Sequence, residues 1–182
     1  MTEPEQNSVE PALPEVHTQR LRLRTPNDRD DVELTRLLSD WSVAKWLARV
    51  PHPYRLADAN EFIKDARAKA LSNYHFIILL DGELIGGAGL TGETTSVLEL
   101  GYWVAREHWG RGYATEAAAG LIAFATTDLG CGRLEAGYQK DNLASSRVLR
   151  KLGFRPSGEK SVFSLARNCD VINTCVFLVL KH

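Results

Sequence analysis

A glycine-rich loop opens the most apolar helical segment of this 182-residue chain. Gly110 and Gly112 flank Arg111, and a helical pattern begins directly after them in the stretch WGRGYATEAAAGLIAFA. A helix N-terminus presents unpaired backbone N–H groups and about half a positive charge. Glycines at this place leave those N–H groups bare, so a large anion such as a pyrophosphate could bind there. Taken alone, the two glycines could equally form only a strand-to-helix turn.

A dinucleotide-binding protein of the Rossmann type is one alternative for this loop. Its fingerprint requires GxGxxG directly after a strand and an acidic residue about 20 positions further on. Glu135 lies at roughly that distance. The third glycine position is Thr115, however, and the spacer REHW separates the loop from the preceding strand pattern. We therefore keep the dinucleotide interpretation as a minor one.

Glu99 is the candidate for acid–base chemistry. It interrupts the otherwise apolar strand pattern LELGYWV, and alternation places it on the same side as Gly101 and Trp103. If that side faces a cleft, burial raises the pKa of the carboxyl group and suits it to act as a general base near neutral pH. The structural alternative is a glutamate paired with an arginine, such as Arg133.

The elements that must position these residues follow from hydrophobic periodicity and turn signals. Residues 1–16 are rich in Pro and Glu and indicate a flexible leader, so we expect a single domain over residues 17–182. Residues 20–25 alternate as an edge strand does. The other strands are expected at 74–80, 83–90, 96–105, 133–139, 160–166 and 170–180, and helices at 27–40, 41–47, 56–71, 113–129 and 142–152. This order, β-α-α-α-β-β-β-α-β-α-β-β, is typical of a mixed α/β sheet with parallel and antiparallel pairs.

Three motifs, in this order and spacing, resemble those of the GNAT superfamily of N-acetyltransferases. WGRGYATEA at 109–117 resembles the acyl-CoA-binding loop of that superfamily. NLASSRVLRKLGF at 142–154 resembles its second motif, and LELGYWV at 98–104 looks like the strand before the loop. The segment DVELTRLLSDWSVAKWLARVPHPY is similar to the front of the RimJ/RimL branch, which acetylates the N-termini of ribosomal proteins. The resemblance covers about Thr18 to the C-terminus.

The resemblance implies the GNAT fold, a mixed α/β (α+β) sheet of seven strands flanked by about four to five helices. It also implies direct acetyl transfer from acetyl-CoA, the co-substrate, to a primary amine in a ternary complex. The acceptor could be a protein N-terminus or a small amine, and the acyl group could be longer than acetyl. The alternatives are a non-catalytic acyl-CoA sensor and, less favoured, the dinucleotide-binding protein.

The resemblance further implies roles for individual residues. Backbone N–H groups from Arg111 to Thr115 would hold the CoA pyrophosphate, and a backbone N–H near Trp103 or Val104 would polarise the thioester carbonyl. Asn142 and Ser145 could bond the pantetheine arm or the sulfur. The predicted cofactor-binding residues are Trp103, Val104, Trp109, Gly110, Arg111, Gly112, Tyr113, Ala114, Thr115, Asn142 and Ser145, and the predicted catalytic residues are Glu99 and Ser145.

Two positions depart from the common GNAT pattern. Trp109 stands where many members carry Gln or Arg, as is usual in the RimJ/RimL branch. Many members also carry a tyrosine seven residues after the motif's asparagine, as the acid that protonates the departing thiolate. That position is Leu149 here, and Ser145 is the nearest substitute because the related branch carries a serine there. The loss of the tyrosine gives the sensor alternative some weight.

Composition argues against several other classes of protein. The 22 Lys and Arg nearly balance the 23 Asp and Glu, so no global field favours nucleic acid or an anionic membrane. The longest apolar run, roughly 117–125, is far shorter than the ~20 residues of a membrane span. Three cysteines without CxxC spacing suggest a reduced, cytoplasmic protein, and no cluster has metal-ligand spacing, so no metal is expected. The C-terminal hairpin could pair edge to edge with a second copy, which makes a homodimer a weak expectation.

Overall fold

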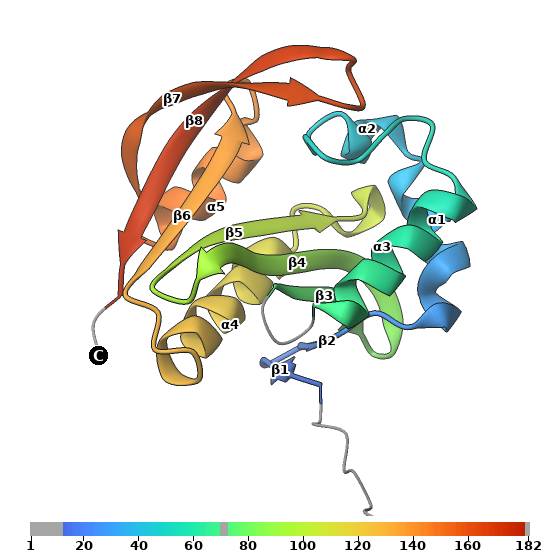
Figure 1. The fold of residues 1–182 in the computed structure, drawn as a ribbon, viewed down its shortest axis with the longest axis horizontal. Coiled ribbons are helices and arrows are strands. Elements are labelled where there is room, and N and C mark those ends of the chain that lie inside the picture. The colour runs from blue at the N-terminus through green and yellow to red at the C-terminus, as the bar shows by residue number, and fades with distance from the viewer. Residues whose placement is uncertain (1–12, 70–72, 181–182) are drawn as a thin grey trace, which may run out of the picture.

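The computed structural model describes residues 13–69 and 73–180, which build a mixed α/β fold (Figure 1). The strands of this part of the chain form one eight-stranded sheet in the order β1-β2-β3-β4-β5-β6-β8-β7. Adjacent strands are antiparallel, except that β5 and β6 are parallel. The strands are β1 (Glu15–His17), β2 (Leu21–Arg24), β3 (Tyr74–Leu80), β4 (Glu83–Thr94), β5 (Val97–Val104), β6 (Arg133–Gln139), β7 (Arg155–Ser164) and β8 (Cys169–Val179). The helices are α1 (Asp31–Leu38), α2 (Trp41–Ala44), α3 (Leu56–Ala68), α4 (Tyr113–Thr127) and α5 (Leu143–Lys151), with short 3-10 turns η1 (Asp28–Asp30) and η2 (Arg106–His108).

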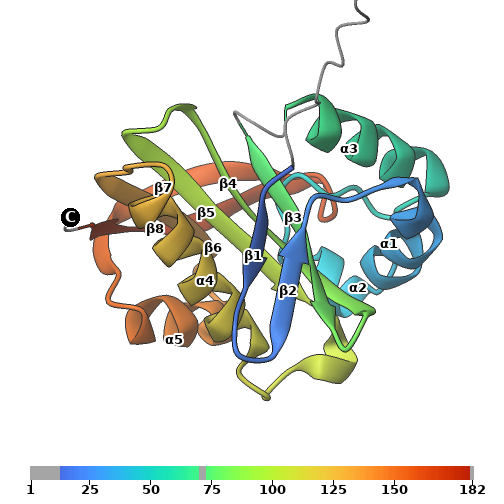
Figure 2. The same ribbon diagram turned by 90° about the horizontal axis from the view of Figure 1, so that it is seen from below.

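The helices divide between the two faces of the sheet, and each face has its own apolar core (Figure 2). On one face α4 and α5 pack against the strands and bury Leu121, Leu134 and Leu149. On the other face α1, α2 and α3 pack against the sheet, with Ile63 and Ile77 among the residues they bury. β3 and the first part of β4 are therefore covered on both sides, which is why their sequences read as nearly continuous apolar runs. In β5 buried and exposed residues alternate as far as Gly101.

The β7–β8 hairpin reaches across the molecule to the segment that follows α2 (Figure 1). The backbone N–H of Leu165, in the hairpin turn, donates to the carbonyl oxygen of Ala48 at 2.9 Å. The side-chain amide of Gln139, at the end of β6, donates to the carbonyl oxygen of Lys45 at 2.8 Å. We call β7, β8 and their turn the hairpin arch. The two bonds tie the arch and the end of β6 to the segment that follows α2.

The predicted order of elements is confirmed from residue 20 onward, but the predicted strand number is wrong. The sheet of the described residues has eight strands rather than seven, because β1 precedes β2 and takes the edge position expected for residues 20–25. The three residues of β1 are too few to show the alternation of polar and apolar side chains by which a strand is recognised in a sequence. The position of Val16 is instead set by tertiary packing against α4. A Cβ added at Gly120 of that helix would lie 3.2 Å from the Val16 side chain. Of the predicted leader, 1–16, residues 1–12 lie outside the described part, as does the expected end of the third helix at 71.

Leu149→Ala tests the core beneath α5. Leu149 is 2% exposed, so removing its side chain leaves a cavity, and we expect the free energy of unfolding to fall by about 2–5 kcal/mol. Leu143→Ala on the same helix is the matched control, because that side chain is 66% exposed and its loss should change stability by less than about 0.5 kcal/mol. Denaturant unfolding of both variants measures this. Equal effects of the two substitutions would contradict the described packing of α5.

Candidate active site

β5 and β6 part after a short stretch of pairing. Their parallel ladder joins Val97–Glu99 to Arg133–Glu135, and within the described structure it extends no further. β5 stays paired with β4 as far as Val104, and β6 with β8 as far as Gln139, so each strand continues without the other. Beside the gap, a Cβ added at Gly101 would meet no described atom within 4 Å. The sheet therefore carries an opening in its middle rather than at its edge.

The unpaired side of β5 offers backbone groups to this gap. The N–H of Ala105 donates to Ile85 on β4, and alternation along the strand directs the N–H of Trp103 to β4 as well. The N–H groups of Tyr102 and Val104 then face the gap. Of the two backbone donors predicted from the sequence, the position of Val104 fits and that of Trp103 does not, because the N–H of Trp103 belongs to the β4 ladder.

The glycine-rich loop turns sharply at both of its glycines before α4 begins. Gly110 has φ of +76° and Gly112, the residue before the helix, has φ of +83°, a left-handed conformation that strains other residues. The indole N–H of Trp109 donates to the carbonyl oxygen of Val104 at 2.6 Å and fixes the loop to the end of β5. The glycines thus shape the turn, and the same turn brings the N-terminus of α4 to the gap.

Arg20 and Glu116 form a hydrogen-bonded ion pair that fixes the glycine-rich loop to the start of β2. The backbone N–H of Arg20 donates to one carboxylate oxygen of Glu116 and its Nε to the other, both at 2.7 Å, and the hydroxyl of Thr18 donates to the same carboxylate at 2.7 Å. The Arg20 guanidinium also donates to the carbonyl oxygen of Arg111 at 3.2 Å and lies 4.5 Å from the ring centre of Tyr113. We call Thr18, Arg20 and Glu116 the loop clamp.

The loop clamp changes the acidity of Glu116. Burial by itself would raise the pKa of this carboxyl group, but the hydrogen bonds from Thr18 and from the backbone and side chain of Arg20 outweigh it and hold the pKa below its ordinary value. The carboxylate also sits in the first turn of α4, where the helix dipole favours negative charge. Sequence reasoning missed this clamp, because its members lie 96 positions apart and nothing local connects them.

The second helix N-terminus at the gap belongs to α5. Asn142 caps it, with its side-chain oxygen accepting the backbone N–H of Ser145 at 3.1 Å. The Ser145 hydroxyl lies 2.9 Å from the hydroxyl of Tyr102, which reaches over from β5. Burial raises the pKa of Tyr102 to about 12, against the opposing effect of its hydrogen bond to Ser145. The predicted residues Asn142 and Ser145 are thus hydrogen-bonded to each other, and the structure adds Tyr102 to them. The only sign of Tyr102 in the sequence was a hydroxyl group in an otherwise apolar strand.

Glu99 does not occupy the buried position expected of it. Its side chain is 46% exposed and its carboxylate lies 3.8 Å from the guanidinium of Arg49, so the expectation that it is buried in a cleft is wrong. The alternative partner suggested by the sequence, Arg133, pairs instead with Glu135 at 2.9 Å. Glu99 is still paired with Glu135 of β6, so the cause is the face on which its side chain lies. Leu98 and Leu100 are buried on the face covered by α4 and α5, whereas Glu99 and Gly101 project from the other face, which is exposed along this part of β5.

His75 lies two strands from Glu99 in the sheet and is a second titratable group near Arg49. Its ring packs edge-on against Phe62, and a Cβ added at Gly89 on β4 would lie 3.3 Å from its Nδ1. Burial, followed by the charges of Arg49 and Lys69, lowers the pKa of His75. The imidazole is therefore neutral near pH 7 and able to accept a proton.

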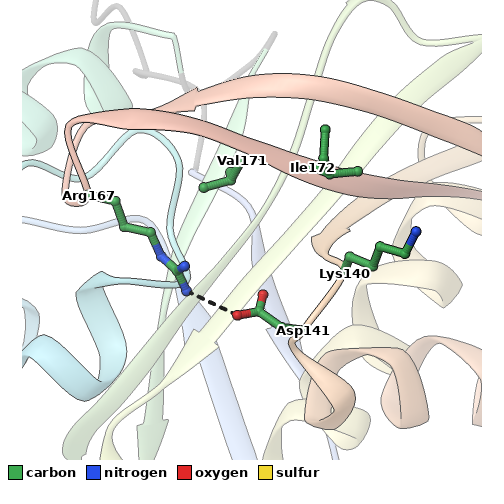
Figure 3. A pocket seen from close by; sticks show the side chains of 5 residues that line it. All are labelled: Lys140, Asp141, Arg167, Val171 and Ile172. Carbon is green, nitrogen blue, oxygen red and sulfur yellow. Dashed lines mark ion pairs between the residues drawn. The ribbon is translucent and has the colours of Figure 1, made fainter.

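A cavity of about 370 Å³ lies beneath the hairpin arch, lined by Lys140, Asp141, Arg167, Val171 and Ile172 (Figure 3). The guanidinium of Arg167 lies 3.6 Å from the carboxylate of Asp141 and donates through Nε to the carbonyl oxygen of Lys45 at 3.0 Å. Asp141 directly precedes the Asn142 cap of α5. The cavity therefore opens beside the gap, and its walls come from the arch and from the end of β6.

Comparison with known proteins decides the family of this chain. Residues 20–155 match the family model described as acetyltransferase (GNAT) domain. The chain belongs to the GNAT family. The predicted family is thereby confirmed, and with it an acetyl-CoA-dependent acyltransferase.

Two curated relatives extend this result along most of the chain. N-acetyltransferase p20 of Bacillus licheniformis, described as uncharacterized, is 30% identical over 172 residues, covering 92% of this chain and 96% of its own. The spermidine N(1)-acetyltransferase of Escherichia coli K12 is 27% identical over 173 residues, covering 91% of this chain and 89% of its own.

Solved structures confirm the predicted GNAT fold. RimJ of Mycobacterium smegmatis, in complex with CoA-disulfide, superposes with a TM-score of 0.81 at 23% identity, covering 92% of this chain and 88% of that one. RimL, a ribosomal L7/L12 alpha-N-protein acetyltransferase in complex with coenzyme A, superposes with a TM-score of 0.82 at 14% identity, covering 92% and 98%. Within the residues described for this GNAT protein, no group of three His, Cys, Asp or Glu side chains could hold a metal ion, and no helix is long and apolar enough to cross a membrane.

Glu116→Gln tests the loop clamp through pH. Because the pKa of Glu116 is lowered in the folded state, its contribution to stability is present above about pH 4.3, the ordinary value for glutamate, and is lost as the pH falls through the lower folded-state value. We expect the variant to be less stable than the wild type at about pH 7 and the difference to shrink in acid. Denaturant unfolding across the pH range measures it. Glu61→Gln, at an exposed position of α3, is the control, and a difference that stays constant with pH would contradict the clamp.

Proposed function

We propose that this GNAT protein transfers an acetyl group from acetyl-CoA to a primary amine by direct attack in a ternary complex. The observation behind the proposal is the gap between β5 and β6, with the N-termini of α4 and α5 both opening onto it. An enzyme that binds a long, polar thioester needs an anion site, a channel with backbone donors and a place for the acceptor. The gap and its borders supply groups suited to each.

The CoA pyrophosphate is proposed to bind at the start of α4. Backbone N–H groups from Arg111 to Thr115 lie at the end of the helix where the dipole favours negative charge. Gly110 leaves its side of the loop open, since an added Cβ would meet no described atom within 4 Å. The loop clamp fixes the carbonyl of Arg111, so the loop is held before any ligand arrives. Such preorganisation lowers the entropy cost of binding.

The pantetheine arm is proposed to lie along the gap. Its amides could pair with backbone groups of β5 that face the gap, as an added strand pairs with a free sheet edge. The N–H of Val104 is the proposed donor to the thioester oxygen, which gains negative charge during attack. Asn142 and Ser145 stand at the opposite border, and we propose Ser145 as the residue that meets the sulfur of the leaving group.

The acceptor amine is proposed to enter from the face of the sheet that carries Glu99, His75 and the cavity under the hairpin arch. Glu99 is the proposed general base because its side chain lies on the same face of β5 as Gly101, with Arg49 at 3.8 Å from its carboxylate. His75 is a second candidate base, because its imidazole is neutral near pH 7. The named activities of RimL and of the spermidine acetyltransferase make a protein N-terminus and a polyamine the first acceptors to test.

A non-catalytic acyl-CoA sensor is the second candidate function. Leu149, at the position where many GNAT enzymes carry the thiolate-protonating tyrosine, is buried and cannot act as an acid. A sensor would bind acetyl-CoA and turn over no amine. A second copy paired along β7, an edge strand with mostly exposed residues, could accompany either function.

Ligand-induced stabilisation tests the proposed cofactor site. Acetyl-CoA at about 100 times its Kd should raise the free energy of unfolding by about 2.7 kcal/mol, and NAD should add nothing. Gly112→Ala should abolish the effect of acetyl-CoA, because an alanine strains the left-handed turn that presents the helix N-terminus. Gly130→Ala is the matched control: this glycine, at the other end of α4, also has positive φ (+61°) and lies away from the loop.

The test compares the stabilisation by acetyl-CoA in the Gly112 and Gly130 variants. Both should lose intrinsic stability, but only the Gly130 variant should keep the acetyl-CoA shift. Equal shifts in both variants would place the cofactor elsewhere, and a shift with NAD alone would favour the dinucleotide-binding alternative.

Glu99→Gln tests the proposed base. If Glu99 removes the proton from the amine, turnover should fall by about 100-fold or more while the affinity for acetyl-CoA stays the same. Turnover is measured as CoA released with a peptide carrying the N-terminus of ribosomal protein L7/L12 and with spermidine. His75→Ala is measured in parallel. A loss confined to the His75 variant would move the role of base to His75, and undiminished turnover of the Glu99 variant would remove Glu99 from the mechanism.

A further inference from the structure

Tyr102 and Ser145 meet across the gap although they lie 43 positions apart. Tyr102 comes from β5 and Ser145 from the first turn of α5, so their bond joins the two borders of the proposed pantetheine channel. The hydroxyl oxygens are 2.9 Å apart, a normal hydrogen-bond length, whereas the carbonyl oxygen of Ser145 lies at a longer 3.4 Å from the tyrosine hydroxyl. Either hydroxyl could donate across the 2.9 Å bond, and the phenol, which is the more acidic of the two, is the better donor to the Ser145 hydroxyl oxygen.

This bond decides where the proton of Ser145 can point. A serine hydroxyl has one proton and two acceptor lone pairs. When Tyr102 donates to the oxygen, the proton of Ser145 stays free for another acceptor, and the serine rotor is held in one orientation. The backbone of Ser145 is fixed as well, because its N–H donates to the Asn142 cap. Both ends of the serine are thus positioned before a ligand binds.

We propose that Tyr102 is a positioning residue that directs the Ser145 hydroxyl proton at the sulfur of the bound acyl-CoA. The inference rests on the proposed function, because it requires the CoA sulfur at the N-terminus of α5. As the C–S bond of the tetrahedral intermediate breaks, its electron pair stays on sulfur, and the thiolate accepts a hydrogen bond from Ser145. No proton leaves either hydroxyl group in this step.

The acidities of the groups agree with stabilisation rather than proton transfer. A free thiol has a pKa of about 8.5, and burial raises the pKa of Tyr102 to about 12. Transfer of the tyrosine proton through Ser145 to a thiolate would therefore be unfavourable. A hydrogen bond to the negative sulfur has no such cost and strengthens as the charge develops. This pair therefore offers the departing thiolate a hydrogen bond in place of a proton, and neither hydroxyl becomes ionised.

The pKa of the thiol of bound CoA tests this inference directly. The thiolate of CoA bound to the full chain is titrated by its ultraviolet absorbance, with the complex of desulfo-CoA as the reference that removes protein absorbance. In the wild type we expect the bound thiol to have a pKa below its free value. Tyr102→Phe and Ser145→Ala should each raise that value by about 1. The double variant should match Ser145→Ala, because Tyr102 acts only through Ser145.

A control variant and two further measurements distinguish a positioning role of Tyr102 from a role in packing. Tyr54→Phe removes the hydroxyl of another buried tyrosine, whose pKa burial also raises to about 12, and it should leave the thiol unchanged. A merely structural role of Tyr102 would alter the melting temperature or the Kd of CoA without moving the thiol pKa. With acetyl-CoA and an accepted amine, Tyr102→Phe should lower kcat about tenfold at an unchanged KM for acetyl-CoA.

Failure of this inference and failure of the proposed function give different results. If CoA binds and its thiol has the same pKa in the wild type and in Tyr102→Phe, the inference is overturned while the proposed function stands. An additional shift from Tyr102→Phe in the Ser145→Ala background would also overturn it, because Tyr102 would then act on the sulfur by itself. If the wild type binds no CoA, the proposed function fails and this inference fails with it.

Discussion

The separation of β5 from β6 is the constraint on which the rest of the structure depends. Two parallel strands that pair at Val97–Glu99 would normally continue side by side. Here each strand follows a different partner, β5 with β4 and β6 with β8. Gln139 at the end of β6 donates to the carbonyl oxygen of Lys45, and Leu165 in the turn of the hairpin arch donates to that of Ala48. The backbone groups left facing the gap need hydrogen-bond partners, so the gap suits an extended polar ligand, which is the basis of the proposed pantetheine channel.

Both functional helices begin where the sheet opens. α4 follows β5 through the glycine loop, and Trp109 ties that loop to Val104. α5 follows β6 through Asp141 and its Asn142 cap. Because each of these helices follows a strand that borders the gap, two positive dipole ends and their free N–H groups lie at one opening. The loop clamp and the Tyr102–Ser145 bond then fix the two borders, and both connect residues far apart in the chain.

The sequence was sufficient to predict what local patterns determine. The helices, the strands from residue 20 onward, the glycine turn and the Asn142 cap all follow from periodicity, left-handed φ preferences and capping chemistry. Contacts between distant segments were not predictable in this way. Arg20 joins Glu116 only because β2 passes the start of α4, and Tyr102 meets Ser145 only because the gap places α5 beside β5. Glu99 was expected to be buried because its strand is apolar, but strand composition does not reveal that one face of β5 is exposed at that residue.

Amide hydrogen exchange with and without saturating acetyl-CoA tests the central claim most directly. If the ligand binds in the gap between the two helix N-termini, exchange should slow at Tyr102 and Val104, across Arg111–Thr115 and at the start of α5. Protection should not change in β1, which lies at the edge of the sheet away from β5 and β6. Protection confined to the loop before α4, with β5 unchanged, would show an anion site without a channel and would contradict the role assigned here to the parting of β5 and β6.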